Sequence, residues 1–85
     1  MRAEDLLPDH LDSGEFNGTI VRKGTVGAFL ANARVFLDPS ATVARREEAE
    51  AHMAGALAAL DALGLFDLFE LRDPALRDFV VRHRG

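Results

Sequence analysis

The sequence of 85 residues contains no cysteine, and this absence excludes disulfides, thiolate metal sites and cysteine nucleophiles. Tryptophan and tyrosine are also absent, which removes the aromatic residues that most often anchor interfaces or stack on nucleic-acid bases. No apolar run reaches the ~18 residues of a membrane span, and no basic and apolar leader opens the chain. Together these absences predict a cytoplasmic protein that is not inserted in a membrane.

Basic residues are fewer than acidic ones, ten against fourteen, and the net charge is −4. A protein that neutralises phosphates needs a surplus of lysine and arginine on one face, so we expect no nucleic-acid partner. Nine of the ten basic residues are arginine, and alanine is the commonest residue. This bias indicates a GC-rich bacterial genome, which makes any alanine pattern less informative.

A chain of this length is too short to divide into two cores, so we expect one domain. Residues 1–12 mix charges with Leu6, Leu7 and Leu11, and Pro8 interrupts any helix there. We therefore predict a flexible N-terminal arm over residues 1–12, followed by a single small globular domain over residues 13–85.

The dipeptide Asn17-Gly18 lies between two short segments of strand character. Both residue types tolerate the positive φ angles of a two-residue type I′ turn, so the sequence predicts a short β-hairpin. An isolated hairpin is marginal in water and must pack on an apolar surface. The helix that follows is the nearest such surface, and we expect the hairpin to pack there.

The segment after the hairpin has the periodicity of a helix. Its apolar residues share one face: Val26, Phe29, Leu30, Ala33 and Leu37. Thr25 stands just before this face, where its hydroxyl can accept from a free backbone N–H of the first turn. Pro39 disfavours helical geometry in the residue before it, so this central helix should end near Leu37 or Asp38.

Two further helices follow from stop and start signals. One is predicted from residue 40 or 41 to residue 62 or 63, where Gly64 supplies a left-handed cap. The dipeptide Asp73-Pro74 predicts the start of a C-terminal helix, and residues 65–71 form either a short helix or an irregular segment. The fold class we predict is α+β and mostly helical, with a short N-terminal β-hairpin packed on about three helices. The alternative is an all-α fold with an irregular N-terminal third.

The second half of the long helix is apolar on most of its sides. One stripe of large residues suits a core, and a second edge consists of small residues, Ala51, Gly55 and Ala59. This edge is either a homodimer seam or a site of ordinary packing against the central helix. Phe66 and Phe69, in the segment that follows the helix, are further candidates for an interface.

Several segments together resemble a family of small bacterial proteins that has no assigned activity. They span roughly residues 17–80 and comprise the Gly24-Thr25-Val26 helix start, the mid-helix Asn32, the run Gly64-Leu65-Phe66-Asp67-Leu68-Phe69, and Pro74, Arg77, Phe79 and Val80. The turn here is Asn-Gly where the family has Asp-Gly, and the linker before Pro74 is shorter. The resemblance therefore bears on the fold and implies no function.

Three polar residues are candidates for a binding site. Thr25 and Asn32 lie two helical turns apart on one face, and an asparagine within an apolar helix usually has a specific partner. Arg77 offers a guanidinium that can hold a carboxylate or a phosphate. Each residue also has a structural interpretation: helix capping for Thr25, a hydrogen bond to a loop or to the hairpin for Asn32, and a salt bridge for Arg77.

No residues have the spacing of a catalytic or metal site. The acidic residues include no spacing that forces an acid and base pair together, and neither a nucleophile motif nor a phosphate-binding glycine loop is present. Glu48 and His52, at i and i+4, offer two ligands on one helical face where zinc needs three or four. We therefore predict no catalytic residue, no metal and no cofactor, which weighs against an enzyme.

Two functions are consistent with this sequence. The first is a small cytoplasmic module for protein–protein interaction that self-associates, or binds another protein, through a surface near Asn32 and the Phe66/Phe69 segment. The second is a small-molecule binding protein or minor enzyme with a polar pocket near Thr25, Asn32 and Arg77. They differ in one geometric requirement, because the second needs these three side chains to converge.

Overall fold

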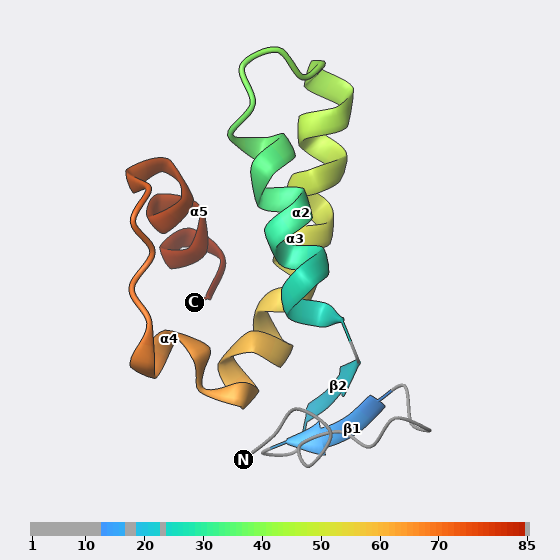
Figure 1. Cartoon of the computed structure of the whole chain (residues 1–85), viewed down its shortest axis with the longest axis vertical. Helices are drawn as coiled ribbons and strands as arrows, with labels where there is room; N and C mark the ends of the chain where they lie inside the picture. Colours follow the sequence, from blue (N-terminus) through green and yellow to red (C-terminus); the bar gives the residue numbers. More distant parts are fainter. Residues whose placement is uncertain (1–12, 17–18, 23, 85) are drawn as a thin grey trace.

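A computed structural model describes residues 13–16, 19–22 and 24–84 of the chain. The predicted arm over residues 1–12 and the predicted turn at Asn17-Gly18 lie outside the described residues. Strands β1 (Ser13–Phe16) and β2 (Thr19–Arg22) pair antiparallel, with Ser13 opposite Arg22. The helices that the structure describes are α2 (Thr25–Phe36), α3 (Val43–Leu63), α4 (Leu65–Leu68) and α5 (Pro74–Arg84) (Figure 1). The predicted mostly helical character is confirmed.

Helix α2 begins differently from the prediction. Gly24, at φ +86°, occupies the N-cap position and supplies no capping side chain. The Thr25 hydroxyl donates a hydrogen bond backward to the Arg22 carbonyl, at 2.7 Å, and no side chain caps the first turn of α2. The prediction of Thr25 as a cap was therefore wrong. The left-handed backbone conformation of Gly24, which glycine adopts more readily than other residues, turns the chain from β2 into α2.

Helix α3 begins at Val43, slightly later than predicted. The preceding loop is folded on itself, because the Asp38 carboxylate accepts hydrogen bonds from both the backbone N–H and the hydroxyl of Ser40. Thr42 then caps the helix by accepting from the Arg45 backbone N–H at 3.1 Å. At the other end Gly64, at φ +81°, closes α3 as a left-handed cap, which confirms the prediction.

The loop between α2 and α3 gives a pH-dependent prediction. Hydrogen bonds from Ser40, first from its hydroxyl and then from its backbone N–H, hold the pKa of Asp38 below its ordinary value. Because the folded-state pKa is the lower one, these bonds stabilise the loop fully above the ordinary pKa, and the contribution is lost as the pH falls through the folded-state pKa. We expect Ser40→Ala to raise the pKa of Asp38 partway back, as measured by NMR titration of its carboxyl carbon. An unchanged titration midpoint would show that the hydroxyl does not hold the pKa down.

The C-terminal helix starts as predicted. The Asp73 carboxylate accepts from the backbone N–H groups of Ala75 and Leu76, at 2.8 and 3.1 Å, and Pro74 occupies the first helical position. Helix α5 buries the face expected for it, with Leu76, Phe79 and Val80 in the core. The core joins α2, α3 and α5 in one cluster of Phe29, Ala33, Met53, Leu57, Leu60, Leu76, Phe79 and Val80.

The predicted apolar face of α2 is only partly buried. Phe29 and Ala33 are in the core, but Leu30 is 53% exposed and Val26 and Leu37 are exposed to a lesser extent. Helix α5 packs more on α3 than on α2, so it leaves this side of α2 open to solvent. The hairpin also differs from the prediction, since its contacts are chiefly with α3 and not with the central helix α2.

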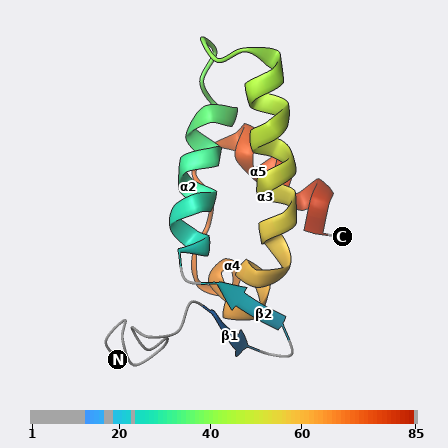
Figure 2. The same ribbon diagram turned by 90° about the vertical axis from the view of Figure 1, so that its right-hand side faces the viewer.

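Two helices form the layer that positions the candidate site. Helices α2 and α3 run side by side, and α5 lies behind them (Figure 2). The opposite face of this layer is covered by no helix or strand among the described residues. No helix in the described part of the chain is both long enough and apolar enough to cross a membrane.

Candidate functional site

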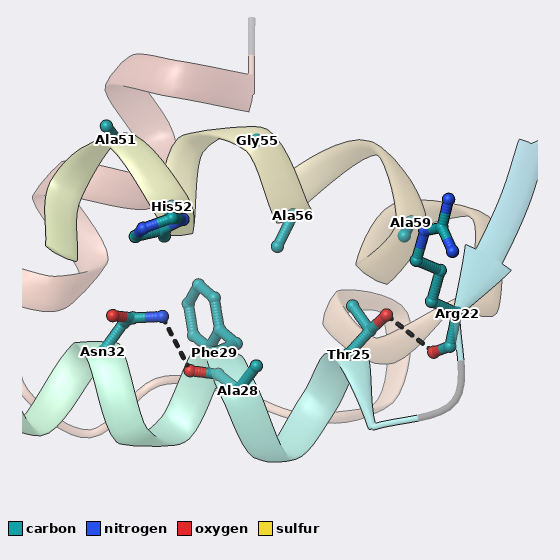
Figure 3. Close-up of a pocket in the computed structure, with 10 residues that line it drawn as sticks. All are labelled: Arg22, Thr25, Ala28, Phe29, Asn32, Ala51, His52, Gly55, Ala56 and Ala59. Carbon is teal, nitrogen blue, oxygen red and sulfur yellow. Dashed lines mark hydrogen bonds between the residues drawn. The ribbon is translucent and has the colours of Figure 1, made fainter. Parts of the chain in front are cut away.

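A groove of about 430 Å³ lies between α2 and α3, on the face that α5 leaves uncovered (Figure 3). Its walls are mostly small or apolar side chains, and four polar residues stand among them. The lining residues are Arg22, Thr25, Ala28, Phe29, Asn32, Ala51, His52, Gly55, Ala56 and Ala59. The groove is therefore an elongated, shallow apolar surface with polar groups placed along it.

The polar groups sit at the two ends of the groove (Figure 3). At one end Asn32 of α2 faces His52 of α3. The Asn32 side-chain amide donates to the Ala28 carbonyl one turn earlier at 3.0 Å, so it is tied to its own helix and not to a loop or to the hairpin. At the other end Arg22, the last residue of β2, extends its guanidinium beside Ala59.

The middle of the groove is lined by the small residues along one edge of α3. Ala51 and Gly55 are exposed and Ala59 is half-buried, so this edge is not packed against α2. A Cβ added to Gly55 would meet no atom within 4 Å, and its φ is not in the left-handed region. Glycine inside a helix costs roughly 0.8–1 kcal/mol relative to alanine. Nothing within the described chain requires glycine at this position.

Charges of opposite sign flank the groove. Arg22 forms no ion pair with any side chain that the structure describes. Glu48 lies beyond the Asn32 end, where it lines a small hollow with Asn32 and Arg45 and approaches His52 Nε2 at 3.8 Å. The Glu48 side chain is 74% exposed, so this contact leaves its carboxylate available to a partner. A cation, Arg22, thus lines one end of the groove, and the exposed carboxylate of Glu48 lies beyond the other end.

Among the described residues that line the groove, no hydroxyl is hydrogen-bonded to a histidine or a carboxylate. The groove's hydroxyl, from Thr25, is engaged with a backbone carbonyl, and its imidazole lies beside an amide and a carboxylate. Among the residues that the structure describes, no group of three or more histidine and acidic side chains could hold a metal ion. The chemistry available here is recognition by shape, apolar contact and charge.

The structure brings together residues that the sequence assigned to two different sites. Thr25 and Asn32, predicted to bind a ligand, line the same groove as the predicted interface residues Ala51, Gly55 and Ala59. Arg77 does not line it, and instead lies 3.6 Å from the Glu70 carboxylate, as its structural interpretation proposed. The three predicted binding residues therefore do not converge.

The two phenylalanines after α3 have different environments. Phe66 packs against the core and carries the Arg84 guanidinium over its ring at 4.9 Å. The same guanidinium group pairs with Asp61 at 2.7 Å and so fastens the end of α5 to α3. Phe69 is 67% exposed. Neither phenylalanine lines the groove, so a surface shared by Asn32 and this segment is not formed there.

Sequence reasoning missed Arg22 as a groove residue and considered His52 only as a metal ligand. The position of Arg22 depends on how the hairpin packs, and the hairpin packs on α3 where the prediction had placed it on α2. The pairing of β2 with β1 indicates that Arg22 is the last residue of its strand. It does not indicate that this end of the strand lies beside Ala59. His52 was identifiable from its place on the same side of α3 as Ala59.

Comparisons of the chain with protein-family models, with curated proteins and with solved structures found no match. The resemblance to a family of small bacterial proteins therefore stays a prediction.

Proposed function

We propose that this chain is a small protein–protein interaction module that self-associates through the groove between α2 and α3. The proposal includes the cytoplasmic setting expected from the sequence and a protein partner in place of nucleic acid. One observation carries it: the uncovered face of the α2–α3 layer presents a groove with an exposed mid-helix glycine that internal packing does not require. A helix that approaches this edge closely would account for the glycine, because a side chain at residue 55 would hold it away.

The exposed apolar surface elsewhere supports an interaction function. The described residues leave several large apolar side chains at the surface, namely Val26, Leu30, Leu37, Val43, Leu68, Phe69 and Val81. Contiguous apolar surface is typical of interaction sites, and three of these residues, Val26, Leu30 and Leu37, share one side of α2 and its C-cap. The alternative of a small-molecule site is less favoured, since its proposed cation, Arg77, is paired outside the groove.

The test is the substitution Gly55→Leu. A Cβ at residue 55 meets no atom within 4 Å, so the monomer should gain the helix propensity that glycine lacks, about 0.8 kcal/mol. Leucine also fills the groove, and overpacking of ~1–3 kcal/mol corresponds to a self-association constant weakened about five-fold to one-hundred-fold. Sedimentation equilibrium of the full chain, from low micromolar to millimolar concentration, measures the association. Thermal unfolding at the lowest concentration measures the stability of the monomer.

Gly27→Leu is the matched control. Gly27 is also an exposed glycine within a helix, a Cβ there also meets nothing within 4 Å, and it does not line the groove. It should give the same gain in thermal stability and leave the association unchanged. A wild-type protein that stays monomeric at millimolar concentration would overturn the proposed self-association.

A further inference from the structure

We infer that the occupant of the groove is the α3 helix of a second copy, antiparallel to the first, with Glu48 of each copy paired to Arg22 of the partner subunit. The inference rests on the proposed self-association and specifies its geometry and register. It is argued from the placement of opposite charges along the groove and from the position of Gly55.

Glu48 of α3 and Arg22 of β2 stand near opposite ends of the same stretch of α3. Glu48 and Ala59 are about three turns apart on α3, or ~16 Å at 1.5 Å per residue. The Arg22 guanidinium lies beside Ala59 (Figure 3). Glu48 lines the hollow next to Asn32, past the other end of the groove. In an antiparallel pair the start of one helix meets the end of the other. Glu48 of one copy therefore reaches the region of Ala59 in the partner subunit, where the partner's Arg22 stands.

Two-fold symmetry makes this contact twice. A symmetric dimer uses the same patch on both copies, so each carboxylate meets a guanidinium and both ends of the groove are matched in charge. Within one chain Arg22 lines one end of the groove, Glu48 lies beyond the other end, and the two side chains form no ion pair with each other. Their charges are therefore available to each other only between copies.

The same register accounts for the glycine. If Glu48 lies opposite Ala59 of the partner subunit, then His52 lies opposite Gly55 of the partner subunit, because the pairing is antiparallel. The imidazole of His52 projects from the groove wall, and its side chain is 62% exposed. Because glycine has no side chain, Gly55 of the partner subunit leaves space for the His52 imidazole. Joining the two α2–α3 layers in this way completes a four-helix arrangement, which covers the open face of each layer.

The test reverses one charge at a time. Glu48→Arg alone places two arginines together at both ends of the dimer, and Arg22→Glu alone places two glutamates together. Each variant should self-associate about ten-fold more weakly than the wild type, or weaker still, because exposed ion pairs contribute up to ~1 kcal/mol and like charges oppose association by similar amounts. Mixing the two variants should restore association, since the mixed dimer pairs arginine with glutamate at both ends. Native mass spectrometry with one variant isotopically labelled measures homodimers and mixed dimers separately.

Two further proteins complete the design. The double variant Arg22→Glu with Glu48→Arg exchanges the charges on one chain and should recover self-association close to that of the wild type. Glu47→Arg makes the same charge change at the neighbouring position, which lines a different hollow with Phe36 and Arg46. It should leave the partner preference unchanged. Circular dichroism of each variant confirms that the helices are retained, and added salt should weaken the wild-type dimer.

The outcomes separate this inference from the function on which it rests. The first outcome is that the wild type associates but the charge variants form homodimers and mixed dimers equally well. This result would overturn the proposed register and leave self-association supported. A wild-type protein that is monomeric when pure overturns both, whether the groove accepts another protein's helix or a small molecule. Preferential formation of the mixed dimer, with recovery in the double variant, supports the inference.

Discussion

Phe79→Ala is expected to lower the free energy of unfolding by ~3–5 kcal/mol, the range for removing a large aromatic side chain from a core. Phe79 is 1% exposed and is among the largest fully buried side chains. Its ring lies 5.3 Å from the Phe36 ring of α2 and stacks on His83 at 4.1 Å, so it joins α5 to α2 as well as to α3. The loss is comparable with the whole stability of a domain of this size.

Chemical denaturation followed by circular dichroism measures this loss. Phe69→Ala is the matched control, because it removes the same side chain from a position that is 67% exposed, and it should change the free energy of unfolding by no more than ~0.5 kcal/mol. Equal losses for the two variants would show that α5 does not depend on Phe79 for its place in the core.

Leu60→Ala is expected to cost ~2–5 kcal/mol. Leu60 is fully buried near the end of α3, and its carbonyl accepts a hydrogen bond from the Gly64 backbone N–H that closes the helix. Truncation leaves a cavity where α3 meets the rest of the core, and the rigid helix cap limits how far the chain can collapse into it. The cost should therefore lie above that of a typical point substitution.

Leu68→Ala provides the same chemical change at a residue that is 84% exposed. Its effect on the free energy of unfolding should stay within ~0.5 kcal/mol. Thermal and denaturant unfolding of both variants give the comparison. A small loss for Leu60→Ala would mean that the end of α3 adjusts to fill the space.

The parts of the fold that could be predicted are those set by local chemistry. Asp73 and Pro74 cap and start α5, and Gly64 ends α3, because in each case one residue type satisfies a backbone requirement by itself. The large residues on α3 were also correctly assigned to the core, since a helix that long has one face that must be buried. These signals act within a few residues of one another.

The predictions that were wrong depend on contacts between distant segments. Thr25 resembles a cap in sequence, but the left-handed Gly24 takes that position and frees the hydroxyl to bind β2. Leu30 belongs to the helical face that includes Phe29, yet it is exposed because α5 packs mainly on α3. Periodicity indicates which residues share a face, but it does not indicate how much of that face another helix covers.

The candidate site was predicted in fragments. The small edge at Ala51, Gly55 and Ala59 follows from spacing on one helix, and Asn32 from its unusual place on another. That these fragments line one groove depends on how α2 lies against α3. The cation that lines the groove is Arg22, whereas Arg77 pairs with Glu70 elsewhere. The position of Arg22 depends on how the hairpin packs, which the sequence does not indicate.

The pairing of α2 with α3 through a short loop also bears on how the chain reaches this fold. These helices are neighbours in sequence, and the contacts between them are the most extensive in the described structure. Low contact order favours folding in microseconds to milliseconds, because little loop entropy is lost before contacts form. The α2–α3 layer can therefore assemble before α5 docks on it. A nascent chain would therefore present the groove between α2 and α3 before its own C-terminal helix is in place.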